Sequence, residues 1–195
     1  MNHIEIEAKM RLDDVETLEA RLTALGAQRV AVLHETNTFF DTGEHTLKSG
    51  DRGLRVRVER DVATGRSTVR ITHKGPRAHG KLKTRPEVEL TADDAQAAAK
   101  LLGALGFHPV LSFEKLRRRW LLDDCRVELD RVPYLGDFVE IEGPSDQAVL
   151  AVREKLGLSN APMLQTSYIA MLSNHMRERG ITATHVPLNP DEASA

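Results

Sequence analysis

Ionic and apolar residues alternate with a period of two in several short segments, and this alternation constrains the fold of the chain more than any other feature. In residues 4–9, Glu5, Glu7 and Lys9 alternate with three apolar side chains. Successive side chains of a β-strand point to opposite faces, so each such segment is predicted to be a strand with one charged face and one apolar face. Seven segments follow the pattern: residues 4–9, 54–58, 69–74, 81–90, 113–120, 126–130 and 138–142.

Four other segments are predicted to form amphipathic helices, because their apolar residues recur at spacings of three and four. In one of them, Leu18, Leu22 and Leu25 share a face, and Gly26 follows as a residue suited to the end of a helix. After Gly180 the chain has neither periodicity nor much apolar content. We therefore expect a single domain over residues 1–179 and a mobile tail over residues 180–195. The predicted helices span roughly residues 13–25, 92–105, 145–156 and 163–179.

Composition narrows the classes of function. The 27 Lys and Arg residues are balanced by 29 Asp and Glu residues, so the chain lacks the basic excess that is usual in nucleic-acid-binding domains. Cys125 is the only cysteine, which excludes an internal disulfide and a multi-cysteine zinc site. No apolar run reaches the roughly 18 residues of a membrane span. These features predict a soluble, cytoplasmic protein, monomeric or homodimeric, with neither a nucleic-acid nor a membrane partner.

The charged strand faces have two interpretations. In the first, an antiparallel sheet turns them to water and covers its apolar face with helices. In the second, the strands close into a barrel with their apolar faces outward, under the helices, and their charged faces inward. The second is favoured because these positions are nearly all ionic rather than mixed polar, and because acids and bases are sorted onto different strands. Helices are also the only clear elements that could cover the apolar faces.

A charged interior requires compensation, because burying an unpaired charge is strongly unfavourable. Clustered Arg and Lys side chains bind phosphate oxygens, whereas clustered carboxylates hold Mg²⁺ or Mn²⁺, which can bridge to the same phosphates. A polyanion bound with its metal would therefore neutralise both groups. The predicted inward residues are seven bases, Lys9, Arg55, Arg57, Lys74, Arg85, Lys115 and Arg117, and seven acids, Glu5, Glu7, Glu87, Glu89, Asp130, Glu140 and Glu142.

An ordered set of motifs over roughly residues 1–175 resembles the CYTH superfamily, the triphosphate tunnel metalloenzymes. The segments H-K-G-P and T-R-P-E-V-E are most similar to those of the class IV adenylate cyclase-type members. The resemblance implies an α+β fold, in which an eight-stranded antiparallel closed tunnel with a charged interior is flanked by helices. The motifs are E-I-E-A-K (5–9), T-F-F-D-T (38–42), L-R-V-R (54–57), H-K-G-P (73–76), T-R-P-E-V-E (84–89), E-K-L-R (114–117), V-E-L-D (127–130), L-G-D-F-V-E-I-E (135–142) and S-Y-I (167–169).

The resemblance also assigns roles to the inward residues. Arg85 is included among the bases, although the following Pro86 predicts a bulge in its strand. Asp41 matches a family position, but its role does not follow from its residue type. No lysine follows Lys155, so a tunnel-closing C-terminal lysine of some thiamine-triphosphatase-like members has no counterpart. The implied phosphate-binding residues are Lys9, Arg55, Arg57, Lys74, Arg85, Lys115 and Arg117; the implied metal ligands are Asp130, Glu140, Glu142, Glu5, Glu7 and Glu87; and the implied catalytic acids are Glu5, Glu7, Glu87 and Glu89.

Three functions remain open at this point. With two Mg²⁺ or Mn²⁺ ions bound, attack of the ribose 3′-hydroxyl of ATP on its α-phosphorus gives cyclic AMP and pyrophosphate, the class IV cyclase reaction. Attack by water on a nucleoside triphosphate or on tripolyphosphate gives hydrolysis at the same site. A module that binds polyphosphate or nucleotide without turnover is the third possibility, and the acids count against it because they weaken polyanion binding unless a metal is present.

Overall fold

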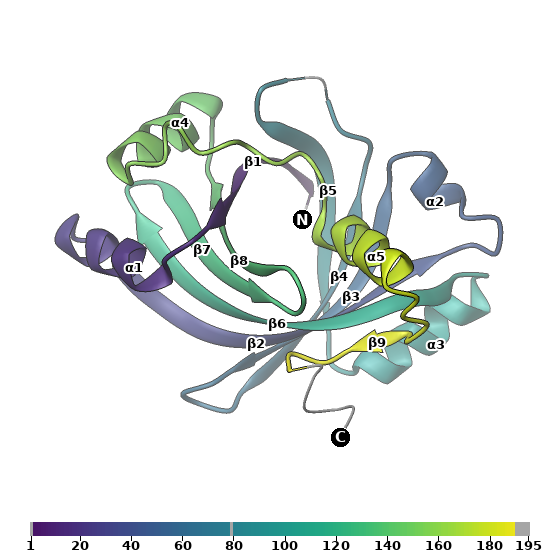
Figure 1. The fold of residues 1–195 in the computed structure, drawn as a ribbon. Helices are drawn as coiled ribbons and strands as arrows, with labels where there is room; N and C mark the ends of the chain where they lie inside the picture. Colours follow the sequence, from purple (N-terminus) through teal and green to yellow (C-terminus); the bar gives the residue numbers. More distant parts are fainter. Residues whose placement is uncertain (1, 79, 190–195) are drawn as a thin grey trace.

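A closed antiparallel barrel of eight strands forms the centre of the computed structural model, which describes residues 2–78 and 80–189 (Figure 1). The strand order is β2-β3-β4-β5-β1-β8-β7-β6, and pairing between β2 and β6 closes the ring. This architecture confirms the predicted fold class. The strands are β1 (Asn2–Leu12), β2 (Gln28–Asp41), β3 (Gly53–Asp61), β4 (Ser67–Lys74), β5 (Lys83–Ala92), β6 (His108–Leu122), β7 (Cys125–Val132) and β8 (Gly136–Glu142).

Each of the seven predicted strands is present, and the strand that the alternation did not predict is β2. Its inward row contains Glu35, Asn37 and Phe39, a mixture of acid, amide and aromatic that has no ionic repeat. The predicted bulge at Pro86 is also absent. Strand β1 pairs with β5 through Ile4 and Pro86 without a shift in register. Because β4 pairs with β5 only from Glu87 onward, Pro86 is not required to donate a hydrogen bond to β4.

The four predicted helices are present as α1 (Val15–Ala24), α3 (Ala95–Ala104), α4 (Asp146–Lys155) and α5 (Tyr168–Glu178). Asp14, Asp94, Ser145 and Ser167 cap their N-termini by accepting backbone N–H groups. The cap at Ser167 explains why α5 begins five residues later than predicted. A further short helix, α2 (Thr46–Ser49), was not predicted. Within the described ranges, no helix combines the length and the apolarity that a membrane crossing requires.

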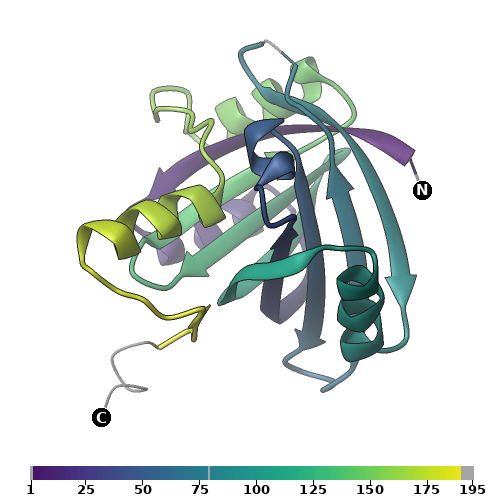
Figure 2. The ribbon, with the colours of Figure 1, turned by 90° about the vertical axis from the view of Figure 1, so that its right-hand side faces the viewer.

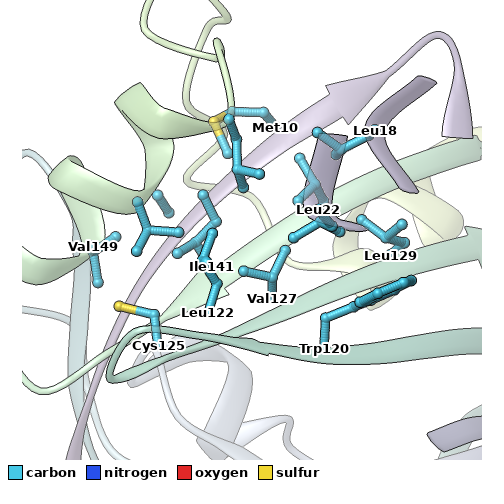
Figure 3. Close-up of a cluster of buried hydrophobic side chains, with 14 of the residues drawn as sticks. Met10, Leu18, Leu22, Trp120, Leu122, Cys125, Val127, Leu129, Ile141 and Val149 are labelled. Carbon is cyan, nitrogen blue, oxygen red and sulfur yellow. The ribbon is translucent and has the colours of Figure 1, made fainter. Parts of the chain in front are cut away.

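Helices α1, α3 and α4 cover the apolar outer face of the barrel, whereas α5 packs on apolar residues at one end of the inward rows, among them Phe113 and Phe138. Figure 3 shows Met10, Val127 and Ile141 on the outer face, packed with Leu22 of α1 and Val149 of α4. Helix α3 covers β3 and β4 in a second cluster, and α5 covers the end of β6 in a third. Figure 2, turned by 90° from Figure 1, shows α5 and α3 well apart from one another. Because apolar side chains occupy the outer face, the ionic rows of the same strands face the interior.

The structure differs from the prediction of a mobile tail after Gly180. Residues His185–Val186 form β9, which pairs in parallel with β6 at Ser112 and Phe113. Val186 is only 1% exposed and joins the apolar cluster under α5. A two-residue strand is too short to show periodicity, so the sequence pattern could not indicate it. The remainder of the predicted tail, residues 190–195, lies outside the described residues.

Candidate functional site

A cavity of about 800 Å³ runs through the barrel. Thirteen of the fourteen predicted inward residues line it, so the ionic rows do face the interior. The exception is Asp130, which is 1% exposed and lies behind the lining. The thirteen are Glu5, Glu7, Lys9, Arg55, Arg57, Lys74, Arg85, Glu87, Glu89, Lys115, Arg117, Glu140 and Glu142.

The lining is richer in bases than the chain as a whole. Among the described residues it contains fourteen Lys and Arg side chains and ten Asp and Glu side chains, whereas the whole chain has a net charge of −2. Two buried carboxylates behind the lining, Glu35 and Asp130, reduce this excess without abolishing it. The interior therefore has a positive surplus, which favours a bound anion.

Arg55 carries much of that surplus. In the described part of the chain its guanidinium forms no ion pair within 4.0 Å, and its buried Nε has no hydrogen-bond partner. Within the described residues, its one side-chain hydrogen bond is a long contact of 3.4 Å from Nη2 to Oγ1 of Thr72. Burial, together with the neighbouring Arg57, lowers the pKa of Arg55 to about 10, so the side chain stays charged at neutral pH. A buried guanidinium without a counter-ion can donate hydrogen bonds to the oxygens of a bound phosphate.

Arg57 and Lys115 both contact Glu35, a buried acid that the predicted site did not include. Arg57 donates to Oδ1 of Asn37 at 2.7 Å and lies 3.2 Å from Oε1 of Glu35. Lys115 lies 3.4 Å from Oε2 of the same Glu35. Burial opposes ionisation of Glu35, but Arg57 and Lys115 outweigh it and hold the pKa of that carboxyl well below its usual range. Burial and the nearby Arg117 lower the pKa of Lys115.

Arg117 is the centre of a buried ion network. Its Nε donates to Oδ1 of Asp130 at 2.6 Å, and its Nη2 donates to Oε2 of Glu140 at 2.6 Å. Glu128 contacts Nη1 of the same guanidinium. Lys115 completes the cluster, 2.9 Å from Oδ2 of Asp130. Both oxygens of Asp130 are therefore occupied by bases, and in this geometry Asp130 orients Arg117 and Lys115 rather than facing the cavity.

Around Lys74, on β4, two carboxylates share a single base. Lys74 lies 2.6 Å from Oε1 of Glu5 and 2.8 Å from Oε2 of Glu87, so two carboxylates share one ammonium. The second oxygen of Glu5 is buried without a hydrogen-bond partner. Burial raises the pKa of Glu142, and the charges of Glu128 and Glu5 add to the rise against the attraction of Arg126.

These observations fit a hard divalent cation. Buried carboxylate oxygens with too few bases nearby are the donors that Mg²⁺ and Mn²⁺ prefer. Within the described residues, however, no three acidic, His or Cys side chains converge on a preformed ion site. The reason is that these acids are already paired with bases. Glu140 lies 3.0 Å from Nζ of Lys9, and Glu7 lies 2.5 Å from Nζ of Lys83. A cation would replace these bases, which would then be free to bind phosphate.

Sequence reasoning missed further lining residues, and most of them carry a usable signal. Arg70, Lys83, Arg119, Arg126 and Glu128 share strand faces with residues that were predicted to point inward, and Glu59 follows Arg57 by one period of two. By contrast, Asn37 and the buried Glu35 behind the lining required knowledge of β2.

Asp41 is placed by the structure at the tunnel mouth, where β2 ends. Its carboxylate accepts backbone N–H groups of Thr42, Leu47 and Lys48 at 2.8, 2.9 and 3.0 Å. Burial opposes ionisation, but these three donors lower the pKa of Asp41. Asp41 therefore holds α2 and its loop against the mouth, and Leu47 and Lys48 line the cavity from there.

Comparison with known proteins agrees with this geometry. The CYTH domain model matches residues 3–168. Adenylate cyclase CyaB of Aeromonas hydrophila is 30% identical over 174 residues, which is 84% of this chain and 86% of that protein. The PH1819 protein of Pyrococcus horikoshii has a TM-score of 0.77 at 25% identity, over 88% of this chain and 99% of that one. HpAC1 from Hippeastrum, described with a dominant triphosphatase activity, has a TM-score of 0.68 at 19% identity, over 88% and 96%. The chain belongs to the CYTH domain family.

Proposed function

We propose that the protein is a Mg²⁺- or Mn²⁺-dependent enzyme that converts ATP to cyclic AMP and pyrophosphate, as the name of its Aeromonas hydrophila relative describes. The observation that supports it most directly is Arg55, a buried guanidinium in a base-rich tunnel, without an ion pair among the described residues. A triphosphate supplies the anionic oxygens that this side chain lacks. The family supports action on a phosphorylated substrate in the same tunnel.

The bases divide into two groups in this proposal. Arg55 binds phosphate directly, because no acid has to be displaced. Lys9 and Lys74 are held by Glu140 and by Glu5 and Glu87, and they would become available to phosphate if those acids held a cation, whereas Lys115 is oriented by Asp130 behind the lining. Arg85 donates to the backbone oxygens of Gly75 and Asp51, so it also holds the tunnel mouth in place. Phosphate binding is thus assigned to Lys9, Arg55, Arg57, Lys74, Arg85, Lys115 and Arg117.

The acids provide the metal ligands and the proton acceptor. Glu140 and Glu142 would hold one cation and Glu5, Glu7 and Glu87 a second, while Asp130 supports the first from behind the lining. Bound Mg²⁺ or Mn²⁺ neutralises the triphosphate and lowers the pKa of the attacking hydroxyl. The 3′-oxygen forms a bond to the α-phosphorus, the bond to the β-phosphate oxygen breaks, and the hydroxyl proton passes to a carboxylate of the set Glu5, Glu7, Glu87 and Glu89.

Hydrolysis of a triphosphate is the alternative on the same residues. It is favoured by the activity described for the Hippeastrum protein. The two reactions differ in the nucleophile, so their products separate them. In the cyclase reaction ATP yields cyclic AMP and pyrophosphate, whereas in hydrolysis ATP or tripolyphosphate yields orthophosphate.

The test is a product assay on the purified chain. Cyclic AMP, pyrophosphate and orthophosphate are measured from ATP and from tripolyphosphate, with Mg²⁺ and then Mn²⁺. Arg55→Met should lower kcat/KM at least about tenfold, because a charge-assisted phosphate contact is lost. The matched control is Arg131→Met, at an exposed Arg paired with Asp137 outside the cavity. No turnover of either substrate with either metal would overturn the proposal.

A further inference from the structure

The ring of Tyr168 lies beside two buried ammonium groups of the tunnel. Nζ of Lys9 lies over the ring, 4.0 Å from its centroid, and Nζ of Lys115 lies 5.1 Å from the same centroid. Lys9 belongs to β1 and Lys115 to β6, with β8 and β7 between them in the sheet. All three side chains line the cavity and are buried. A cation within about 6 Å of a ring centroid is attracted by the ring, so Tyr168 interacts with bases from two parts of the tunnel wall.

The fold fixes the orientation of this ring and keeps it uncharged. Tyr168 is the first residue of α5, whose N-terminus Ser167 caps. The ring of Phe138 on β8 packs edge-on against it, with centroids 5.1 Å apart and an angle of 69° between the planes. Burial, together with the nearby charges of Asp130 and Glu140, raises the pKa of Tyr168 well above its usual value, so the phenol is neutral at pH 7. The ring is therefore a fixed, uncharged surface beside the two lysines.

An aromatic ring holds an ammonium in a different way from a carboxylate. Nζ of Lys9 lies 3.0 Å from Oε1 of Glu140, and Nζ of Lys115 lies 2.9 Å from Oδ2 of Asp130. A carboxylate brings negative charge, which repels a phosphate, whereas a neutral ring attracts the ammonium without adding charge. An ammonium has three N–H donors. A lysine held over a ring therefore keeps its place and still has donors for phosphate oxygens, even where its acid holds a cation instead.

We infer that Tyr168 is a positioning residue, whose ring holds Lys9 and Lys115 in place for the phosphates of the substrate. The inference rests on the proposed function, since it assumes that these two lysines bind phosphate. Tyr168 acts through the two ammonium groups and not through its hydroxyl, because Oη forms no hydrogen bond within the described residues. The segment S-Y-I (167–169) thereby gains a role that the charge pattern of the strands could not supply.

The experiment measures by calorimetry how tightly tripolyphosphate binds with Mg²⁺, because this ligand consists of phosphate groups alone. Tyr168→Leu removes the aromatic face and keeps an apolar side chain, so binding should weaken about tenfold, the scale of a buried cation–π contact. Tyr168→Phe keeps the ring and should bind within about twofold of the unmodified protein, since the hydroxyl that it loses is unpartnered within the described residues. A loss in Tyr168→Phe as large as that in Tyr168→Leu would assign the effect to the hydroxyl and overturn the inference.

A matched control separates positioning from packing. Leu172 lies one turn further along α5, is buried in the same apolar cluster as Tyr168 and stands outside the cavity lining that the described residues form. Leu172→Ala should lower the Tm, because it leaves a cavity, and should keep tripolyphosphate binding within about twofold. Equal losses of affinity in Leu172→Ala and Tyr168→Leu would show that α5 needs only to be packed, and the positioning role would be wrong.

A double variant tests whether the ring acts through the lysines. Lys9→Met removes the ammonium that lies over the ring. In that background Tyr168→Leu should weaken binding by at most about threefold, because only the more distant Lys115 remains and two residues that share one contact are not additive. A further tenfold loss would show that the ring acts independently of Lys9 and would contradict the inference, leaving the proposed function intact. Failure of tripolyphosphate to bind the unmodified protein would instead overturn the proposed function, and the inference with it.

Discussion

Nζ of Lys74 lies 2.6 Å from Oε1 of Glu5, although 69 positions separate the two residues in the chain. The contact spans the tunnel wall from β4 to β1 across β5, and Lys74 also contacts Glu87. One base that serves two carboxylates shows how the interior is neutralised without a ligand. In each ion pair of the tunnel, the base is a candidate to bind phosphate and the acid is a candidate to bind a metal ion.

The first prediction is that a triphosphate with metal stabilises the fold strongly. Tripolyphosphate or ATP with Mg²⁺ relieves the surplus positive charge at Arg55 and the carboxylates that share Lys74. At a hundredfold excess over Kd the gain is about 2.7 kcal/mol, which corresponds to a rise in Tm of roughly 5–10 °C for a chain of this size. Differential scanning fluorimetry measures it. A rise of the same size with sulfate would show that any anion suffices and would contradict a built site.

The second prediction concerns two acids on one strand face. Glu140 is paired with Lys9 and Arg117, so Glu140→Gln removes the nearest acid of Lys9 and one of the three acids around Arg117, and should lower stability by about 3–5 kcal/mol. Burial and the nearby Glu128 and Glu5 raise the pKa of Glu142, so its ionised form is unfavourable in the fold. Glu142→Gln should therefore keep or raise the Tm at pH 7 while abolishing the metal-dependent rate. Urea unfolding and a metal titration of activity distinguish the two variants.

The third prediction is a loss of stability in acid. The pKa values of Glu5, Glu35, Glu59, Glu87 and Glu140 lie below the ordinary 4.5, because nearby bases outweigh the effect of burial. The unfolded chain therefore binds these protons first as the pH falls. The resulting stability is fully present above pH 4.5 and is lost as the pH falls through the lower folded values. Thermal melts from pH 7 to pH 3 should show a steep fall in Tm below about pH 4.5. A flat profile over that range would contradict the internal ion pairs.

Glu142 changes the stability with pH in the opposite direction from these five acids. Since its folded pKa is raised, protonation near pH 4.5 favours the fold, and that contribution is lost as the pH rises through the folded value. In Glu142→Gln the decline of Tm toward acid should therefore be steeper than in the unmodified protein.

The fourth prediction concerns Asp41. Asp41→Ala removes three hydrogen bonds to backbone N–H groups and leaves the loop around α2 unsupported. Stability should fall by about 1–2 kcal/mol, the scale of a lost helix cap. Since the loop lines the mouth rather than the ionic interior, KM for ATP should rise while kcat stays within about threefold. A fall in kcat with unchanged KM would assign Asp41 to the chemistry instead. Steady-state kinetics with ATP and Mg²⁺ separate these outcomes.

The period-two alternation predicted seven of the strands and most of the lining. The closed barrel was favoured over an open sheet because those positions are nearly all ionic and because helices could cover the apolar faces, and the family resemblance implied its eight strands. Glu5, Glu7, Arg55 and Arg57 follow directly from the alternation. Glu35 could not be found in this way, since its neighbours in the inward row are Asn37 and Phe39. The ion-pair partners of each charged residue could not be predicted from the sequence either, because they depend on the register in which β2 pairs with β6.

The role of Asp130 could not be predicted from the sequence either. Its alternation with Glu128 predicts an inward residue, but its depth behind the lining depends on how Arg117 and Lys115 fold over it. A resemblance carries over residue types and their order, whereas the packing of side chains around a buried carboxylate is a property of the closed barrel.

The last prediction contrasts two arginines of the tunnel. Arg117 contacts Asp130, Glu128 and Glu140 within the buried network, and Arg55 forms no ion pair within the described residues. Arg117→Met removes the one base that these three acids share and should cost about 3–5 kcal/mol of stability. Arg55→Met removes an uncompensated buried charge, so its Tm should stay the same or rise.

Arg55→Met and the Arg117 variants should also differ in how strongly a ligand stabilises them. Arg55→Met should remain folded yet lose most of the Tm rise that tripolyphosphate and Mg²⁺ produce in the unmodified protein. Arg117→Lys serves as the conservative variant, because a single ammonium cannot reproduce the forked contacts of the guanidinium, and it should recover only part of the lost stability. A destabilised Arg55→Met that still responds fully to tripolyphosphate would show that Arg55 supports the fold and that the phosphates bind elsewhere in the tunnel.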